Sequence, residues 1–93
     1  MIVAMSRFAC DAMQADEIER RFRARSRLVD GHGGFLGLEV LRSIGARPEF
    51  VLVTRWESRA ALGAYLKSED FRAVHAEVEE QDAVFTLYEQ VAT

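Results

Sequence analysis

His75 is the side chain in this 93-residue sequence with the clearest capacity for chemistry. It follows Phe71 and Val74 and precedes Val78, at spacings that predict one apolar stripe of a helix. A neutral imidazole in such surroundings can ligate haem iron through one ring nitrogen. The same position also suits a half-buried histidine that bonds a carbonyl or an acid such as Glu79. Spacing alone leaves both interpretations open.

Arg25 interrupts the apolar stripe of an earlier predicted helix, where Ile18, Phe22 and Val29 occupy the neighbouring turns. A planar guanidinium at a pocket edge binds carboxylates well, and a haem propionate or an acidic organic substrate would suit it. The alternative is an arginine whose stem lies over the core while its charged head stays in water.

Aromatic side chains can line a small-molecule site between helices and sheet. Phe22 and Tyr65 are the candidates for such a lining, whereas Trp56, at the end of a predicted strand, is assigned to the core. Ser6 lies in an apolar strand with no basic residue close by in position to activate it, so nucleophilic catalysis is poorly supported. His32 lies in a glycine-rich segment and is predicted to be an exposed loop residue.

Composition limits the class of protein. The chain has 12 Lys and Arg against 15 Asp and Glu, a net charge of -3, which disfavours a nucleic-acid partner. Cys10 is the single cysteine, so an intrachain disulfide and a multi-cysteine metal site are excluded. No apolar run has the length of a membrane span or the pattern of a signal peptide. We therefore expect one domain over residues 1–93, cytoplasmic and without a membrane partner.

The elements that position these residues follow from changes in the hydrophobic period. The predicted order is a strand over 2–10, a helix over 11–29, strands over 35–43 and 49–57, a helical region broken in two by caps at Ser58 and Ser68, and a strand over 83–91. This order is typical of the ferredoxin-like βαββαβ arrangement, an α+β fold with a four-stranded antiparallel sheet and helices on one face.

Both faces of the predicted sheet are apolar. In the third strand Phe50 points one way and Val51 the other, and in the second strand simple alternation directs Phe35 and Leu38 to opposite faces. Two helices can cover only one face of the sheet. The other face is therefore predicted to meet the same face of a second copy, which gives a homodimer built sheet to sheet.

Three stretches carry a family resemblance: GGFLGLEVLRS, EFVLVTRWES and ALGAYLKSEDFRAVHAEV. They resemble the antibiotic biosynthesis monooxygenase (ABM) superfamily of dimeric α/β barrels, and within it the IsdG-type haem-degrading monooxygenases. The resemblance covers nearly the whole chain. Its more specific part is the stretch from Tyr65 to His75.

The resemblance implies a haem site with three positions. In the haem-degrading members these hold an asparagine on the first strand, a tryptophan on the second helix and, ten residues later, the histidine that is the axial iron ligand. Here they hold Ser6, Tyr65 and His75. The leading hypothesis is therefore an ABM-type monooxygenase or binding protein whose ligand is haem. In it, His75 holds the iron, Phe22 and Tyr65 lie against the ring, Arg25 lies near a propionate, and an external donor supplies electrons.

Two other functions stay open at this point. One is a cofactor-independent oxygenase acting on a phenol or quinol, with Tyr65 and His75 as an acid–base pair. The other is a non-catalytic dimer that binds a small ligand. An RNA-recognition module shares the element order, but its third strand carries basic and stacking residues that residues 49–55 lack.

Overall fold

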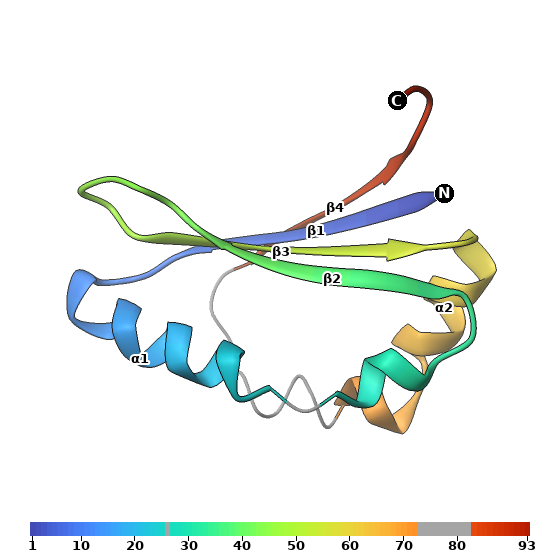
Figure 1. The fold of residues 1–93 in the computed structure, drawn as a ribbon, viewed down its shortest axis with the longest axis horizontal. Helices are drawn as coiled ribbons and strands as arrows, with labels where there is room; N and C mark the ends of the chain where they lie inside the picture. The colour runs from blue at the N-terminus through green and yellow to red at the C-terminus, as the bar shows by residue number, and fades with distance from the viewer. Residues whose placement is uncertain (26, 73–82) are drawn as a thin grey trace.

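The computed structural model describes residues 1–25, 27–72 and 83–93. Its elements are β1 (Ile2–Ala9), α1 (Ala12–Arg23), the 3₁₀-helix η1 (Leu28–Gly31), β2 (Phe35–Arg42), β3 (Glu49–Trp56), α2 (Arg59–Leu66) and β4 (Val84–Glu89). The strands form one antiparallel sheet in the order β2-β3-β1-β4. The helices lie together on one side of this sheet (Figure 1). The predicted ferredoxin-like α+β fold is confirmed.

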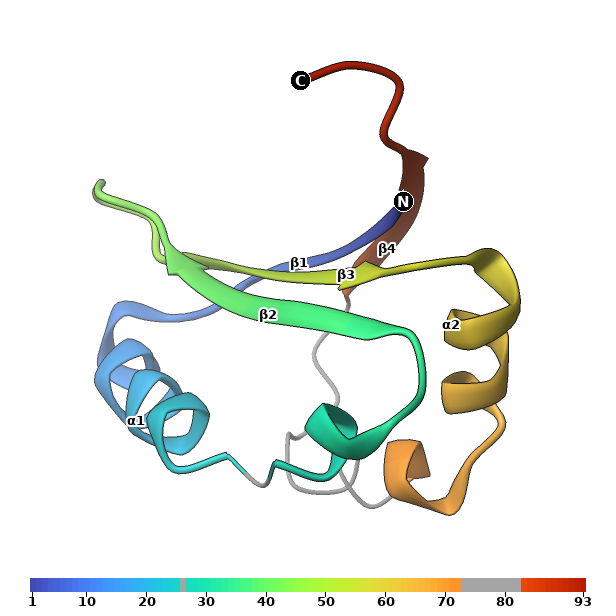
Figure 2. The ribbon, with the colours of Figure 1, turned by 45° about the vertical axis from the view of Figure 1, so that its right-hand side comes forward.

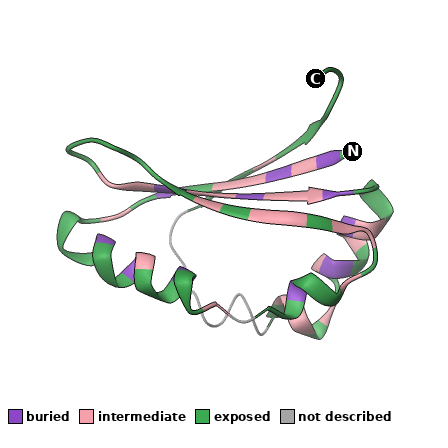
Figure 3. Ribbon diagram, in the orientation of Figure 1, coloured by how far each residue is buried: buried purple, intermediate pink, exposed green. Residues whose placement is uncertain are grey.

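Two hydrophobic clusters hold the helices to the inner face of the sheet, the face that they cover (Figure 3). The buried residues of the α1 cluster are Phe8, Ala15, Ile18, Phe22 and Phe50. The buried residues of the α2 cluster are Ile2, Ala4, Val29, Trp56, Leu62 and Tyr65. None of the helices in the described ranges is long and apolar enough to cross a membrane.

The first helix is shorter than predicted. It ends at Arg23, where the Ala24 amide donates to the carbonyl of Arg20 (3.1 Å), and the chain forms η1 only after several further residues. The periodicity is misleading here because Phe22 and Val29 belong to different clusters. One continuous helix would have kept both residues on a single stripe, so the chain leaves the helix to reach the α2 cluster.

The alternation of β2 is also different from the prediction. Phe35 pairs with Trp56 and Gly37 pairs with Arg55, so a β-bulge lies between Phe35 and Gly37. The bulge inserts one residue and shifts the alternation. Phe35 and Leu38 therefore both pack against the α2 cluster, and the prediction that they point to opposite faces is wrong.

The predicted break in the second helical region is confirmed. The Ser58 hydroxyl accepts a hydrogen bond from the Ala61 amide (3.1 Å) at the start of α2. The Ser68 hydroxyl accepts from the Phe71 amide (3.1 Å) and donates to the Tyr65 carbonyl (2.6 Å). Both serines satisfy amides that a helix start leaves without a partner, and residues 69–72 begin a new helical turn.

Arg42, at the end of β2, joins the sheet to α1. Its Nη1 donates to Asp16 Oδ1 (2.9 Å) and Glu19 Oε1 (3.0 Å), and Glu19 also accepts from Arg23 Nε (3.2 Å). The hydrogen bond from Arg42, followed by that from Arg23, lowers the pKa of Glu19 below its ordinary value.

A carboxyl with a lowered pKa in the folded state makes the protein sensitive to acid. The stability that Glu19 contributes is fully present above the pKa of the unfolded chain and is lost as pH falls through the lower folded value. We therefore expect Glu19→Gln to flatten the dependence of the unfolding free energy on pH in the acid range, measured by urea titration. Glu17→Gln is the matched control, because among the described residues Glu17 pairs with Arg20 and Arg21 of its own helix and with no residue of the sheet. An equal effect of both variants would contradict the role of the Arg42 contact.

Candidate functional site

A strip of the inner face crosses the sheet where the two clusters adjoin, and we call it the inner band. One of its residues, Ala4, is a buried member of the α2 cluster, and the others are partly or largely exposed. Cross-strand pairing aligns Val40, Leu52, Ser6 and Phe85 in one row and Leu38, Thr54, Ala4 and Leu87 in the next. The residues of β2 and β3 in these rows are half-buried, as is Ser6. On β4, Phe85 and Leu87 are 52% and 44% exposed. The inner band thus offers an apolar surface with the Ser6 hydroxyl near its middle.

Tyr65 lies at the α2 end of the inner band and is only 7% exposed. Its ring stacks on Trp56, with centroids 5.2 Å apart and an interplanar angle of 27°. No hydrogen bond to its hydroxyl is formed within the described part of the chain. A buried phenol without a partner is costly, and such a group marks a place where a ligand or water can bind.

The environment of Tyr65 keeps its phenol protonated. Burial raises the pKa of Tyr65, the charge of Asp70 raises it further, and the charge of Arg25 lowers it. Because burial is the largest of these causes, the hydroxyl remains a neutral hydrogen-bond donor through the neutral pH range. Tyr65 is therefore suited to donate a hydrogen bond and poorly suited to act as a base.

Arg25 comes from the segment between α1 and η1 and reaches the same region as Tyr65. Its Nη2 lies 3.3 Å from Asp30 Oδ1, and its side chain is largely buried. Its charge lowers the pKa of Tyr65, against the larger effects of burial and Asp70. Arg25 thus supplies a positive charge within electrostatic range of the Tyr65 phenol.

The other predicted site residues are distributed along the sheet. Phe22 is buried in the α1 cluster, with its ring 5.7 Å from that of Phe50 and 6.2 Å from that of Phe8. Ser6 lies between the clusters on β1. His75 lies outside the described residues. Phe22 and Tyr65 therefore mark opposite ends of the inner band instead of one shared aromatic wall.

The prediction that His32 is an exposed loop residue is wrong. Its side chain is 21% exposed, its Nε2 lies 2.8 Å from Asp70 Oδ2, and its ring meets the edge of Tyr65 at 4.9 Å. Figure 2 shows η1, just before His32, beside the chain that follows α2. Glycines on both sides indicated a solvent-exposed loop, and Asp70 is 38 residues away. Spacing in the sequence therefore held no signal for this contact.

A family model described as antibiotic biosynthesis monooxygenase matches residues 1–77. The chain belongs to this family. The expectation drawn from the three sequence stretches is therefore confirmed at the level of the family.

Two curated relatives of this ABM-family chain are named as haem enzymes. The chain is 33% identical over 64 residues to the heme oxygenase (mycobilin-producing) of Mycobacterium tuberculosis (strain ATCC 25618 / H37Rv). These aligned residues make up 69% of this chain and 61% of that enzyme. The chain is also 42% identical over 50 residues to the heme-degrading monooxygenase of Shouchella clausii (strain KSM-K16). These aligned residues make up 52% of this chain and 47% of that protein. The chain thus matches between about half and about three fifths of the length of these relatives.

Solved structures of the family share the fold. The heme-degrader MhuD of Mycobacterium tuberculosis, with two hemes bound in its active site, has a TM-score of 0.82 and 28% identity over 100% of this chain and 98% of that chain. SnoaB, a cofactor-independent oxygenase from Streptomyces nogalater, has a TM-score of 0.81 and 17% identity over 99% of this chain and 94% of that chain. The second likeness concerns the fold alone.

Proposed function

We propose that this ABM-family chain is a haem-binding monooxygenase that degrades haem on the inner band. The observation that carries the proposal is the buried Tyr65 phenol, without a hydrogen-bond partner among the described residues, at the end of a half-covered apolar strip. The two relatives named as haem enzymes support the same ligand. The cofactor-independent oxygenase supports only a shared fold.

The described residues fit the chemical character of haem, which is a flat apolar ring with two carboxylates. The inner band supplies apolar surface, and Phe22 and Tyr65 at its two ends would lie against the ring. Arg25 would bind a propionate in exchange for part of its contact with Asp30. His75, outside the described residues, is proposed as the axial iron ligand on the family resemblance.

Haem, when bound, supplies the iron centre that activates dioxygen, with electrons from an external donor. The chain contributes orientation and the polarity of the site. The raised pKa of Tyr65 keeps its hydroxyl able to donate a hydrogen bond. Ser6 offers a shorter hydroxyl near the middle of the inner band, at the position where haem-degrading members carry an asparagine.

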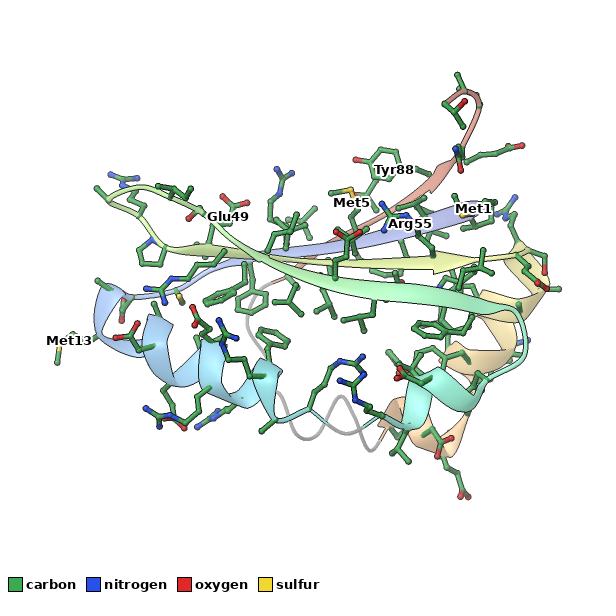
Figure 4. The ribbon with its side chains drawn as sticks, in the orientation of Figure 1. Met1, Met5, Met13, Glu49, Arg55 and Tyr88 are labelled. Carbon is green, nitrogen blue, oxygen red and sulfur yellow. The ribbon has the colours of Figure 1, made fainter. Side chains whose placement is uncertain are left out.

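We also propose that the protein works as a homodimer that forms through the outer face of the sheet, opposite the helices. Figure 4 shows Met5, Arg55 and Tyr88 on this face. Its apolar residues come from all four strands: Val3, Met5, Leu41, Val51, Val53, Val84 and Tyr88. A second copy would cover this surface.

A haemin titration followed by absorbance tests the haem proposal. We expect a saturable Soret shift at about one haem per chain, because one set of axial ligand, ring contacts and cation is present per chain. Addition of a reductant in air is then expected to bleach the Soret band. Weak absorbance that does not saturate would contradict haem binding, and oxygen uptake with phenols and quinols would then test the cofactor-independent alternative. Saturable binding without bleaching would favour a non-catalytic ligand-binding dimer.

A further inference from the structure

Tyr65 is enclosed by side chains from three separate segments. Trp56 of β3 stacks on its face, the His32 ring meets it at 4.9 Å and 74°, and the Phe71 ring meets it at 5.4 Å and 79°. His32 is in turn bonded to Asp70 at 2.8 Å. We propose that His32 and Asp70 are positioning residues that hold the Tyr65 ring against Trp56 and direct its hydroxyl to the ligand. This inference rests on the proposed function, because it assigns Tyr65 to the ligand site.

The local structure fixes His32 in this place. η1 ends with the His32 amide bonded to the Val29 carbonyl (3.0 Å), and Val29 is buried in the α2 cluster. Gly34 follows with φ = 81°, and a Cβ there would lie 2.5 Å from the Cβ of Ala61 on α2. The chain can approach α2 this closely only with glycine at that position. The backbone that carries His32 is therefore held in place before it, at Val29, and after it, at Gly34.

The opposite side of the contact is fixed just as locally. The Ser68 hydroxyl caps the turn that begins at residue 69 and bonds the Tyr65 carbonyl, so Tyr65 and Asp70 belong to one hydrogen-bonded corner. The bond between His32 and Asp70 joins η1 to this corner across 38 residues of sequence. Without it, the imidazole would lose the partner that sets its ring orientation against Tyr65.

The contact also shapes the charge around the phenol. Asp70 and Arg25 act on the pKa of Tyr65 in opposite directions, and burial adds to the effect of Asp70. His32 lies between the carboxylate and the phenol ring, in contact with both. Asp70, His32 and Tyr65 therefore form one unit, in which the position of the imidazole determines that of the phenol.

The chain has one tryptophan, so its tryptophan fluorescence and the tryptophan bands of its near-ultraviolet circular dichroism report on Trp56 and the ring stacked on it. We expect His32→Ala and Asp70→Ala to reduce the Trp56 signals in the ligand-free protein by similar amounts. The double variant is expected to change them no more than either single variant, because both remove the same contact. Asp70→Asn keeps an oxygen acceptor of the same shape and is expected to restore most of the signal. Glu69→Gln, an exposed neighbour, is the matched control.

Haemin titration of the same variants measures the consequence for binding. We expect His32→Ala to weaken haemin binding by roughly two- to tenfold, the range that the loss of one aromatic pair corresponds to. Trp56 signals that stay unchanged in His32→Ala and Asp70→Ala would overturn the positioning role, even if the wild type binds haemin. Absence of saturable binding in the wild type, with Trp56 signals still lost in both variants, would overturn the haem proposal and leave the positioning of Tyr65 supported. Asp70→Asn covers the case in which an alanine variant fails to fold.

Discussion

Replacement of His75 by alanine is expected to abolish saturable haemin binding. The proposed bond between the imidazole and the iron is the one directed interaction with the metal, whereas the rest of the site contributes apolar contacts, the Arg25 cation and the hydroxyls of Tyr65 and Ser6. We expect the affinity for haemin to fall by on the order of 100-fold or more, which is about 2.8 kcal/mol of binding free energy. The measurement is an absorbance titration of wild type and variant side by side, with the position of the Soret band recorded at saturation.

Two control variants separate loss of the axial ligand from other causes. His32→Ala removes the chain's other histidine and is expected to keep the Soret position of the wild type despite its weaker binding. Met13→Ala removes an exposed thioether on α1 and is expected to leave both the affinity and the spectrum unchanged. A His75→Ala variant that binds haemin with the wild-type spectrum and affinity would refute the assignment of His75 as ligand.

Short-range signals in the sequence predicted the fold well. Ser58 and Ser68 each precede a helical turn, and both hydroxyls make the predicted cap bond. The strands were recognisable because each apolar run ends at a charged residue or a turn within a few positions. Information of this kind is local, since the donor, the acceptor and the pattern all lie within four residues.

Contacts between distant segments were not predictable in the same way. The bulge after Phe35 depends on pairing with β3, and the end of α1 depends on which cluster buries Val29. The bond from His32 to Asp70 depends on the packing of η1 against the chain after α2. Of the candidate site, the sequence predicted Tyr65 and Arg25, but not the His32 imidazole that contacts Tyr65.

The outer face of the sheet combines apolar side chains from all four strands with two ion pairs. Met5 of β1 lies next to Val53 of β3 in the register, and both lie on this face. The Arg55–Glu39 pair and the Arg7–Glu49 pair (3.3 Å) compensate charges on the same surface. Apolar contacts together with polar groups that already have partners are what protein interfaces contain. This arrangement is the physical basis for the proposed homodimer.

Met5→Asp is expected to convert the dimer to monomers, because a two-fold interface would bury the new carboxylate twice, while the neighbouring cations Arg7 and Arg55 already pair with Glu49 and Glu39. Each buried unpaired carboxylate costs several kcal/mol, so we expect the dissociation constant of the dimer to rise by at least about 100-fold. Light scattering at micromolar concentration measures the change. Met13→Asp, whose side chain points away from the body of the protein at the far end of α1 (Figure 4), is the matched control.

Tyr88→Asp, on the half-exposed strand β4, provides a second test of the same face in case Met5→Asp fails to fold. We expect monomers from this variant as well, because Tyr88 lies beside Val3 in the register of β1 and β4. A wild-type protein that is a stable monomer at micromolar concentration would refute the dimer directly. Retention of the dimer by both aspartate variants would place the interface elsewhere, because two carboxylates on the outer face cannot be buried there without cost.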